Sequence, residues 1–361
     1  MTRHLYVHVP FCLKACPYCS FYKEAGDRSH TRGFLEAVLL EAESEAPGLR
    51  PETVFFGGGT PTALATGQLE FLISGLRERV DFSAVEEFSV EMNPATVSPG
   101  KAAALLALGV NRASIGVQSW DDSLLRTLGR VHTGAQAARS HAILRSAGFA
   151  NINLDLMFGI PGQSESQWRD TLETTIGLAP EHISAYCLTY EEDTEYFRRY
   201  ARGGCPPDDS RDAEFFEIAM DTLAAAGFAQ YEISNHARPG RECLHNLGYW
   251  RGEDYAGLGP GAFGTRAGKR RRNIANTSEY IRRIQHGLPA QDFSEDVTPS
   301  IRHAERIAFG LRTSDGIRPE DADPGVLAAL EAGGLVATGG SRVTLTRKGR
   351  LLADEVAAEL I

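Results

Sequence analysis

Six short segments rich in apolar and β-branched residues recur in the first half of the chain. They span residues 5–9, 53–56, 87–92, 112–117, 152–158 and 182–188. Between them, apolar residues recur at helical spacing over residues 31–46, 66–80, 99–108, 135–147 and 164–178. Strands that alternate with helices are joined by right-handed crossovers, so the pattern predicts an α/β fold with a parallel sheet.

Polar and glycine-rich sequences follow the predicted strands. A loop with three cysteines follows the first strand, GGGTP follows the second, and EMNP, GVQSW and DLMFGIPG lie at the ends of later strands. The carboxyl ends of parallel strands in a barrel converge on one mouth, where ligands bind. Six strands therefore predict a partial (β/α)6 barrel over residues 1–207, with its site at that mouth.

The alternation changes after residue 207. A long helix (210–226), a strand (229–233), a glycine-rich stretch (257–264) and a helix (278–286) predict an extension over residues 208–298. Two helices, short strands near Gly339 and a final helix then predict a small winged-helix-like module over residues 299–361. Its candidate recognition helix carries Glu331 and no basic residue, so we expect a structural or partner-facing role.

Composition and charge narrow the functional classes. Of the 361 residues, 42% are hydrophobic and 23% charged, as in ordinary globular proteins. The net charge of -10 argues against a nucleic-acid-binding surface. The basic run 269–272 is either a solvated loop or a site for carboxylates or phosphates. No segment has the pattern of a signal peptide or a transmembrane helix, so we expect a cytoplasmic protein.

Three of the six cysteines lie close together. Cys12, Cys16 and Cys19 follow the spacing CxxxCxxC, and no fourth Cys or nearby His completes a tetrahedral zinc site. Disulfides are rare in a reducing compartment. Three thiolates hold an iron–sulfur cube and leave its fourth iron free for an exogenous ligand. The spacing therefore predicts a 4Fe-4S cluster.

The cysteine loop resembles a known cluster loop. YVHVPFCLKACPYCSF is similar to that of the radical S-adenosylmethionine (SAM) superfamily. The resemblance implies that SAM chelates the fourth iron and that its reductive cleavage yields a 5′-deoxyadenosyl radical. GGGTP lacks the following Lys-Ser or Lys-Thr of a phosphate loop. It is similar to the superfamily's glycine-rich strand end, which implies that Gly58, Gly59 and Thr60 contact the methionine amino group.

Further candidates for SAM binding lie at or beyond the ends of later strands. They are Glu91, Gln118, Arg130 and Asp155. Together they offer carboxylates for ribose hydroxyls, an amide for the base or sugar, and a guanidinium for the methionine carboxylate. Taken alone, each of these residues is also consistent with an ordinary polar residue whose hydrogen bonds are satisfied within the protein, or with a helix cap. Their contexts resemble those of coproporphyrinogen III oxidase-like radical enzymes, in which Tyr6 matches a cofactor-contacting position.

Two features favour one branch of that group. Phe21 stands where oxygen-independent coproporphyrinogen III oxidases carry a further cysteine, and residues 245–250 read HNLGYW, an HNxxYW motif. Together they resemble the HemW-type haem chaperones, which implies haem as bound cargo.

The motif supplies the candidate haem contacts, which are His245, Asn246, Tyr249 and Trp250. Imidazole can ligate haem iron, and aromatic rings can stack on a macrocycle. The alternative is a buried aromatic turn that contains a hydrogen-bonded histidine.

Three functions remain open at this point. The first is a haem chaperone that delivers haem to an unidentified acceptor protein, with a homodimer as one candidate assembly. The second is an oxygen-independent coproporphyrinogen III oxidase that decarboxylates propionate side chains. The third is a radical enzyme that acts on an unrelated substrate. The chain is expected to hold the cluster and SAM in all three.

Overall fold

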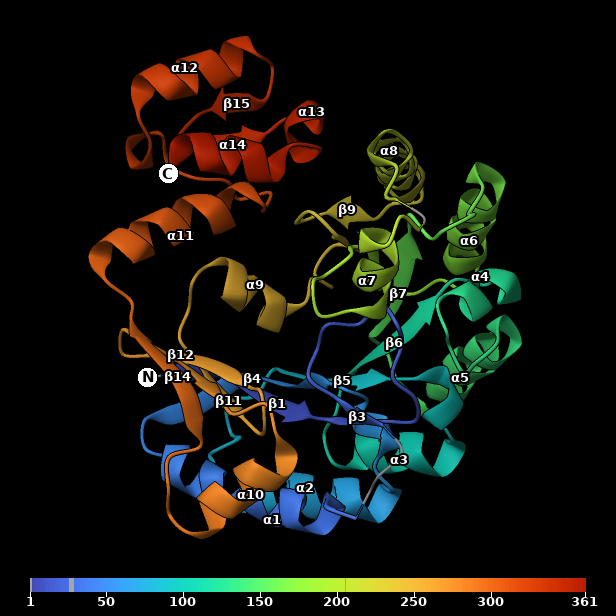
Figure 1. The fold of residues 1–361 in the computed structure, drawn as a ribbon, viewed down its shortest axis with the longest axis vertical. Coiled ribbons are helices and arrows are strands. Elements are labelled where there is room, and N and C mark those ends of the chain that lie inside the picture. Colours follow the sequence, from blue (N-terminus) through green and yellow to red (C-terminus); the bar gives the residue numbers. More distant parts are fainter. Residues whose placement is uncertain (1, 26–28, 205) are drawn as a thin grey trace.

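The computed structural model describes residues 2–25, 29–204 and 206–361, and a curved parallel sheet organises most of them (Figure 1). The six expected strands are β1 (Thr2–Val9), β4 (Leu49–Gly58), β5 (Glu87–Met92), β6 (Arg112–Gln118), β7 (Ile152–Phe158) and β8 (His182–Cys187). They pair in that order and every pair is parallel. The predicted partial (β/α)6 architecture is confirmed, as an open curved sheet in the described residues.

Helices return the chain between these strands and cover the outer face of the sheet (Figure 1). They are α1 (Thr31–Glu45), α2 (Thr66–Arg79), α3 (Pro99–Ala107), α5 (Gly134–Ala147) and α6 (Glu165–Gly177), and α8 (Asp209–Ala225) follows β8. The sequence analysis did not predict two shorter helices, α4 (Asp122–Thr127) and α7 (Glu195–Ala201). Both begin at capping side chains, Asp121 and Thr194, which accept backbone N–H groups. No helix in the described ranges is long and apolar enough to cross a bilayer.

The sheet extends beyond the six strands at both ends. β11 (Tyr255–Leu258) pairs in parallel with β1, and β12 (Phe263–Arg266), β13 (Lys269–Asn273) and β14 (Gln291–Asp296) follow in antiparallel pairs. β10 (Asn235–Ala237) and β9 (Ala229–Gln230) extend the β8 end. The strand predicted over 229–233 is therefore shorter, and the glycine-rich stretch 257–264 contributes to two strands. The predicted helix 278–286 is α10 (Thr277–Gln285).

The basic run is a strand, so its interpretation as a solvated loop is wrong. It forms β13, and acidic residues distant in sequence pair with two of its arginines, Arg270 and Arg272. Arg270 donates hydrogen bonds to Glu295 and Glu305, and Arg272 pairs with Asp292. Such cross-strand ion pairs stabilise a strand that has little apolar content.

The C-terminal residues form a small unit with a hydrophobic core of its own. Its elements are α11 (Pro299–Leu311), α12 (Pro324–Ala332), β15 (Val336–Gly339), β16 (Arg342–Leu345), α13 (Arg347–Arg350) and α14 (Ala353–Leu360). Ile307, Val343 and Val356 are buried at its centre. The order of helices and hairpin agrees with a winged-helix-like module. The domain boundaries at residues 207 and 298 stay predictions.

Candidate functional site

The cysteine loop follows β1 and includes the short strand β2 (Phe11–Cys12), which pairs with β3 (Glu24–Ala25). Cys12, Cys16 and Cys19 are free thiols, and all three are partly exposed. Cys12 Sγ lies 3.6 Å from Thr60 Oγ1, and Arg130 Nη1 lies 3.7 Å from Cys16 Sγ. The GGGTP segment and Arg130 therefore adjoin the cysteine loop, as the sequence predicts for a shared cofactor site.

No three or more His, Cys, Asp or Glu side chains in the described ranges converge closely enough to hold a single metal ion. A four-iron cube is wider than one ion, and its thiolates bind it at separate corners. Burial raises the pKa values of Cys12 and Cys19, so ligation by metal is needed to hold them as thiolates near neutral pH. The donor set fits a cluster better than a single ion.

The GGGTP segment at the end of β4 leaves no room for side chains. Gly58 has φ +101°, and a Cβ there would lie 2.4 Å from the ring of His8. A Cβ on Gly59 would lie 2.6 Å from Pro10 O. Because both positions exclude a side chain, the backbone can approach a ligand closely. The Gly58 N–H donates a hydrogen bond to Glu91 Oε2 at 3.2 Å.

A cavity of about 160 Å³ gathers all the predicted SAM residues except Tyr6. The predicted residues that line it are Gly58, Gly59, Thr60, Glu91, Gln118, Arg130 and Asp155. Cys19 also contributes to its wall, which joins this cavity to the cluster loop. Tyr6 lines a larger neighbouring cavity instead, and its hydroxyl lies 3.1 Å from His8 Nδ1. We call these two spaces the SAM cavity and the large cavity.

Two carboxyl groups line the SAM cavity, and the pKa of each is raised. Burial, together with the nearby Asp155 carboxyl, raises the pKa of Glu91 to about 8. Burial also raises the pKa of Asp155, which accepts hydrogen bonds from Asn153 Nδ2 at 2.7 Å and Ser114 Oγ at 3.1 Å. Among the described residues, the Glu91 oxygens accept only the Gly58 N–H, so they keep acceptor capacity for hydroxyl or ammonium groups.

Gln118 and Arg130 complete the wall of the SAM cavity. Gln118 has φ +66°, which is unusual for a residue with a side chain, and its Oε1 accepts a hydrogen bond from Tyr186 at 2.7 Å. Strain of this kind concentrates at functional sites. Arg130 Nη2 donates to Gly116 O at 2.7 Å, while its buried Nε has no partner in the part of the chain that the structure describes. An additional acceptor, such as a ligand carboxylate, would satisfy that nitrogen.

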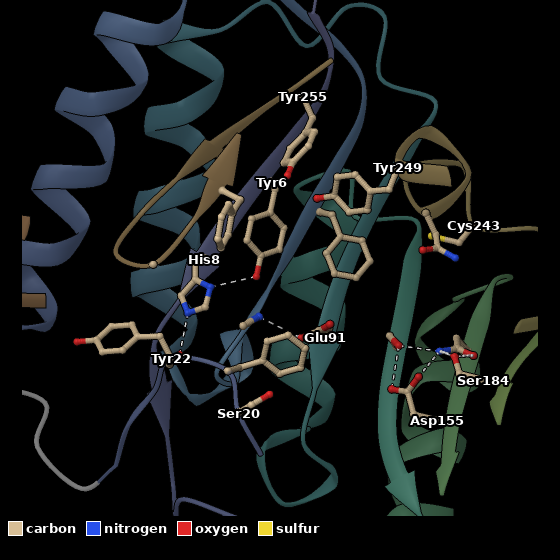
Figure 2. Close-up of a pocket in the computed structure, with 18 of the residues that line it drawn as sticks. Tyr6, His8, Ser20, Tyr22, Glu91, Asp155, Ser184, Cys243, Tyr249 and Tyr255 are labelled. Atoms are coloured by element: carbon tan, nitrogen blue, oxygen red, sulfur yellow. Dashed lines mark hydrogen bonds between the residues drawn. The ribbon is translucent and has the colours of Figure 1, made fainter. Parts of the chain in front are cut away.

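The large cavity measures about 790 Å³, a volume typical of small-molecule sites. Its aromatic wall comes from Tyr6, Phe55, Tyr249, Tyr255 and Phe263. Figure 2 shows Tyr6, Tyr249 and Tyr255 gathered on one side, with Asp155 and Ser184 on strands across the space. Gly58, Glu91 and Asp155 line both cavities, so the two spaces adjoin.

The HNxxYW motif lies on α9 (Leu244–Trp250), and its residues point in different directions. Asn246 and Tyr249 line the large cavity. His245 is only 1% exposed and its ring stacks on Phe55 with centroids 5.2 Å apart. Trp250 packs against Phe309 of α11, and it is not among the residues that line the cavity.

A chain of hydrogen bonds connects Tyr249 to the carboxylate of Glu253. Tyr249 Oη lies 2.9 Å from His245 Nε2, and His245 Nδ1 lies 2.6 Å from Thr53 Oγ1. Thr53 Oγ1 lies 2.8 Å from His4 Nδ1, and His4 Nε2 lies 2.9 Å from Glu253. When His4 donates from Nε2 to Glu253 and accepts at Nδ1 from Thr53, Thr53 accepts from His245 Nδ1 and Tyr249 donates to His245 Nε2.

Both ring nitrogens of His245 are therefore engaged in this structure. Burial lowers the pKa of His245 well below its ordinary value, so the ring is neutral, as the chain of hydrogen bonds requires. The structure matches the alternative interpretation of the motif, a buried aromatic turn with a hydrogen-bonded histidine. Ligation of haem iron by His245 stays a prediction that requires the bonds to Thr53 and Tyr249 to break.

The sequence analysis missed Glu87 and Arg112, two buried charged residues near α9. Glu87 begins β5 and caps the N-terminus of α9, accepting the N–H groups of Leu244 at 2.9 Å and His245 at 3.2 Å. Arg112 begins β6, is 2% exposed and lines the large cavity. A charged residue at the start of an otherwise apolar strand is the signal that identifies such positions. Cys187 and Cys205 received no role in the sequence analysis, and Cys205 lies outside the described residues.

Comparisons with known proteins agree with this geometry. The model of the radical SAM superfamily matches residues 6–175. The solved structure of the coproporphyrinogen III oxidase HemN from Escherichia coli superposes with a TM-score of 0.86 and 23% identity, covering 99% of this chain and 89% of that one. Residues 6–175 thus match the radical SAM superfamily, and the chain has the fold of that solved structure.

Relatives with higher sequence identity to this chain identify the family within that class. "Heme chaperone HemW" of Bacillus subtilis is 37% identical over 98% of both chains. The protein of the same name from Mycobacterium tuberculosis is 37% identical over 99% of this chain and 94% of its own length. The one from Escherichia coli is 39% identical over 72% and 69%. The chain belongs to the HemW family.

Proposed function

We propose that this protein is a haem chaperone, which binds haem in the large cavity and delivers it to an acceptor protein. The observation that carries the proposal is the position of α9: its HNxxYW motif supplies Asn246 and Tyr249 to an aromatic cavity that adjoins the SAM cavity. The names of the HemW relatives support the same function. The acceptor, an assembly of two copies and a cytoplasmic location remain parts of the proposal.

The residues around the SAM cavity fit a 4Fe-4S cluster and SAM. Cys12, Cys16 and Cys19 would hold the cluster, and the side-chain-free backbone at Gly58 and Gly59 would face the methionine amino group. When both are bound, they supply one-electron cleavage of a carbon–sulfur bond.

The other residues of the SAM cavity act by binding and orientation. Glu91 and Asp155 accept hydroxyl or ammonium donors, and the unpartnered Nε of Arg130 suits a carboxylate. Gln118 offers its remaining amide group to the base or sugar. Tyr6, held by His8, orients the side of the cofactor that faces the large cavity.

The haem contacts are divided among the motif residues. Tyr249 and Asn246 meet the cargo directly, because they line the large cavity. His245 acts as a positioning residue, since its ring holds the Tyr249 hydroxyl at 2.9 Å and stacks on Phe55. Trp250 connects α9 to the C-terminal module through Phe309 and supports the helix from outside the cavity.

Oxygen-independent coproporphyrinogen III oxidation is the second candidate function. It is favoured by the shared wall of the two cavities, because a radical formed in the SAM cavity would meet a porphyrinogen in the large one. Phe21 argues against it. Its ring is 65% exposed, contributes to the walls of both cavities and offers no thiol for proton or hydrogen-atom transfer.

Anaerobic protein with a full cluster tests both candidates. We expect saturable haem binding and no multiple turnover of coproporphyrinogen III with SAM and a reductant. Tyr249→Ala should weaken haem binding about 2- to 12-fold, the value of one aromatic contact. Tyr200→Ala is the matched control, since Tyr200 is exposed on α7 and is absent from the walls of both cavities. Sustained turnover without haem binding would establish the oxidase instead.

A further inference from the structure

Arg112 places a buried positive charge beside the large cavity without a counter-ion. In the described residues no carboxylate oxygen lies within 4.0 Å of its guanidinium. Nη1 makes one long hydrogen bond, 3.5 Å to Ser89 Oγ, and the buried Nε has no partner. Burial of a charge is costly unless the charge is paired, so this arrangement calls for an anion.

The two nearest candidates for a counter-ion are already engaged. Glu87 directs its oxygens at the N-terminus of α9, where it accepts the Leu244 N–H at 2.9 Å. Asp155 faces the SAM cavity and accepts a hydrogen bond from Asn153 at 2.7 Å. Each carboxylate stabilises the charge of Arg112 only from beyond ion-pair distance. The guanidinium therefore keeps most of its donors for another partner.

A second arginine in the same cavity provides a contrast. Arg272 on β13 also lines the large cavity, but Asp292 holds it in a two-point pair with distances of 3.0 and 3.1 Å. Its guanidinium also lies 5.9 Å from the centre of the Phe263 ring. Of the two arginines in the described wall, one is neutralised by the protein and the other is not.

We propose that Arg112 binds a carboxylate substituent of the aromatic ligand that occupies the large cavity. The inference rests on the proposed function, under which the ligand is haem and the substituent is a propionate. A guanidinium binds a carboxylate in a planar, two-point pair, which fixes the ligand's rotation as well as its depth. Arg112 does not line the SAM cavity, whose guanidinium is Arg130, so the methionine carboxylate of SAM is a separate anion.

Haem and haem dimethyl ester distinguish this role, because the ester keeps the macrocycle and removes both carboxylates. The full chain with its cluster is titrated anaerobically with each. We expect the wild type to prefer haem by roughly tenfold to a hundredfold, the range of a charge-assisted hydrogen bond. Arg112→Met should bind the two within about twofold of each other, and Arg112→Lys should keep part of the preference. Arg272→Met, the matched control, should keep most of the preference because Arg272 is already paired.

Several results would overturn the inference. Equal binding of haem and ester by the wild type would do so without any variant, as would loss of the preference in Arg272→Met alone. A lower melting temperature of haem-free Arg112→Met with an unchanged preference would make Arg112 a structural cation. If Arg112→Met does not fold, Arg112→Lys replaces it, and a full preference there would count against the two-point pair. If the wild type binds no haem at all, the proposed function fails as well, which separates that outcome from the others.

Discussion

The acidity of Glu91 predicts that SAM binding and folding stability respond to pH in opposite directions. Burial raises its pKa from 4.5 to about 8. Glu91 lines the SAM cavity. Near neutral pH the group is therefore mostly protonated in the folded protein without ligand, whereas it is ionised in the unfolded chain.

The sign and size of the stability effect follow from proton linkage. Between pH 4.5 and pH 8 the folded state binds more protons than the unfolded state, so the contribution of Glu91 to stability is present at low pH and is lost as pH rises. Across the two units from pH 6 to pH 8 the ceiling is about 2.7 kcal/mol. Water in the cavity screens the ionised form, so we expect about 1 to 2 kcal/mol.

SAM has the opposite preference, because its sulfonium and ammonium groups favour an ionised Glu91. The affinity of the cluster-loaded protein for SAM should rise about tenfold between pH 6 and pH 8. Glu91→Gln cannot ionise, so its affinity should be lower at pH 8 and nearly independent of pH. In chemical denaturation, its stability should fall less than that of the wild type over the same interval.

The chain offers a matched control in Glu41. Burial raises its pKa to about 7, but it lies between Tyr280 and Asn273, away from the SAM cavity. Glu41→Gln should change the pH dependence of stability and leave SAM binding as in the wild type. Anaerobic calorimetry at several pH values measures the affinities. Wild-type affinity for Glu91→Gln at every pH, or a flat wild-type profile, would refute the reasoning.

Three further predictions concern the cofactors and α9. Cys16→Ala, purified without oxygen, should lose iron and sulfide together, because two thiolates leave two irons open; wild-type iron content would contradict the assignment. Asp155→Asn should weaken SAM binding roughly tenfold while the cluster's visible spectrum persists. A wild-type affinity of this variant, measured by calorimetry, would exclude Asp155 from the SAM site. His245→Phe keeps the stack on Phe55 and removes two hydrogen bonds, so we expect about 1–3 kcal/mol lower stability in denaturation with haem still bound. Complete loss of haem there would identify His245 as the iron ligand.

The pattern of apolar residues predicted the radical SAM half of the fold because each strand there is a buried run of mostly apolar residues. Residues 87–92 and 152–158 form strands with the predicted bounds, and the polar residues after the strands meet in one cavity. β13 escaped prediction because its stability comes from ion pairs such as Arg272–Asp292, whose partners lie far apart in sequence. The residues next to a charged run do not show whether such partners exist elsewhere in the chain.

The large cavity shows the same limit at the level of single residues. Sequence alone does not distinguish a histidine that ligates a metal from His245, whose partners Thr53 and Phe55 belong to a distant strand. Nor does it distinguish a paired arginine from Arg112, since both depend on which carboxylates lie within reach. These properties arise from tertiary contacts, which the sequence specifies only through the fold.

The attachment of α9 at both ends has a mechanical consequence. Its first turn is held by Glu87 on β5, four residues before Glu91 on the same strand, and its last residue, Trp250, packs on Phe309 of the C-terminal module. This seven-residue helix therefore connects the sheet to the module through contacts at both of its ends. A shift of the module against the sheet would break these contacts or move Tyr249 along the wall of the large cavity.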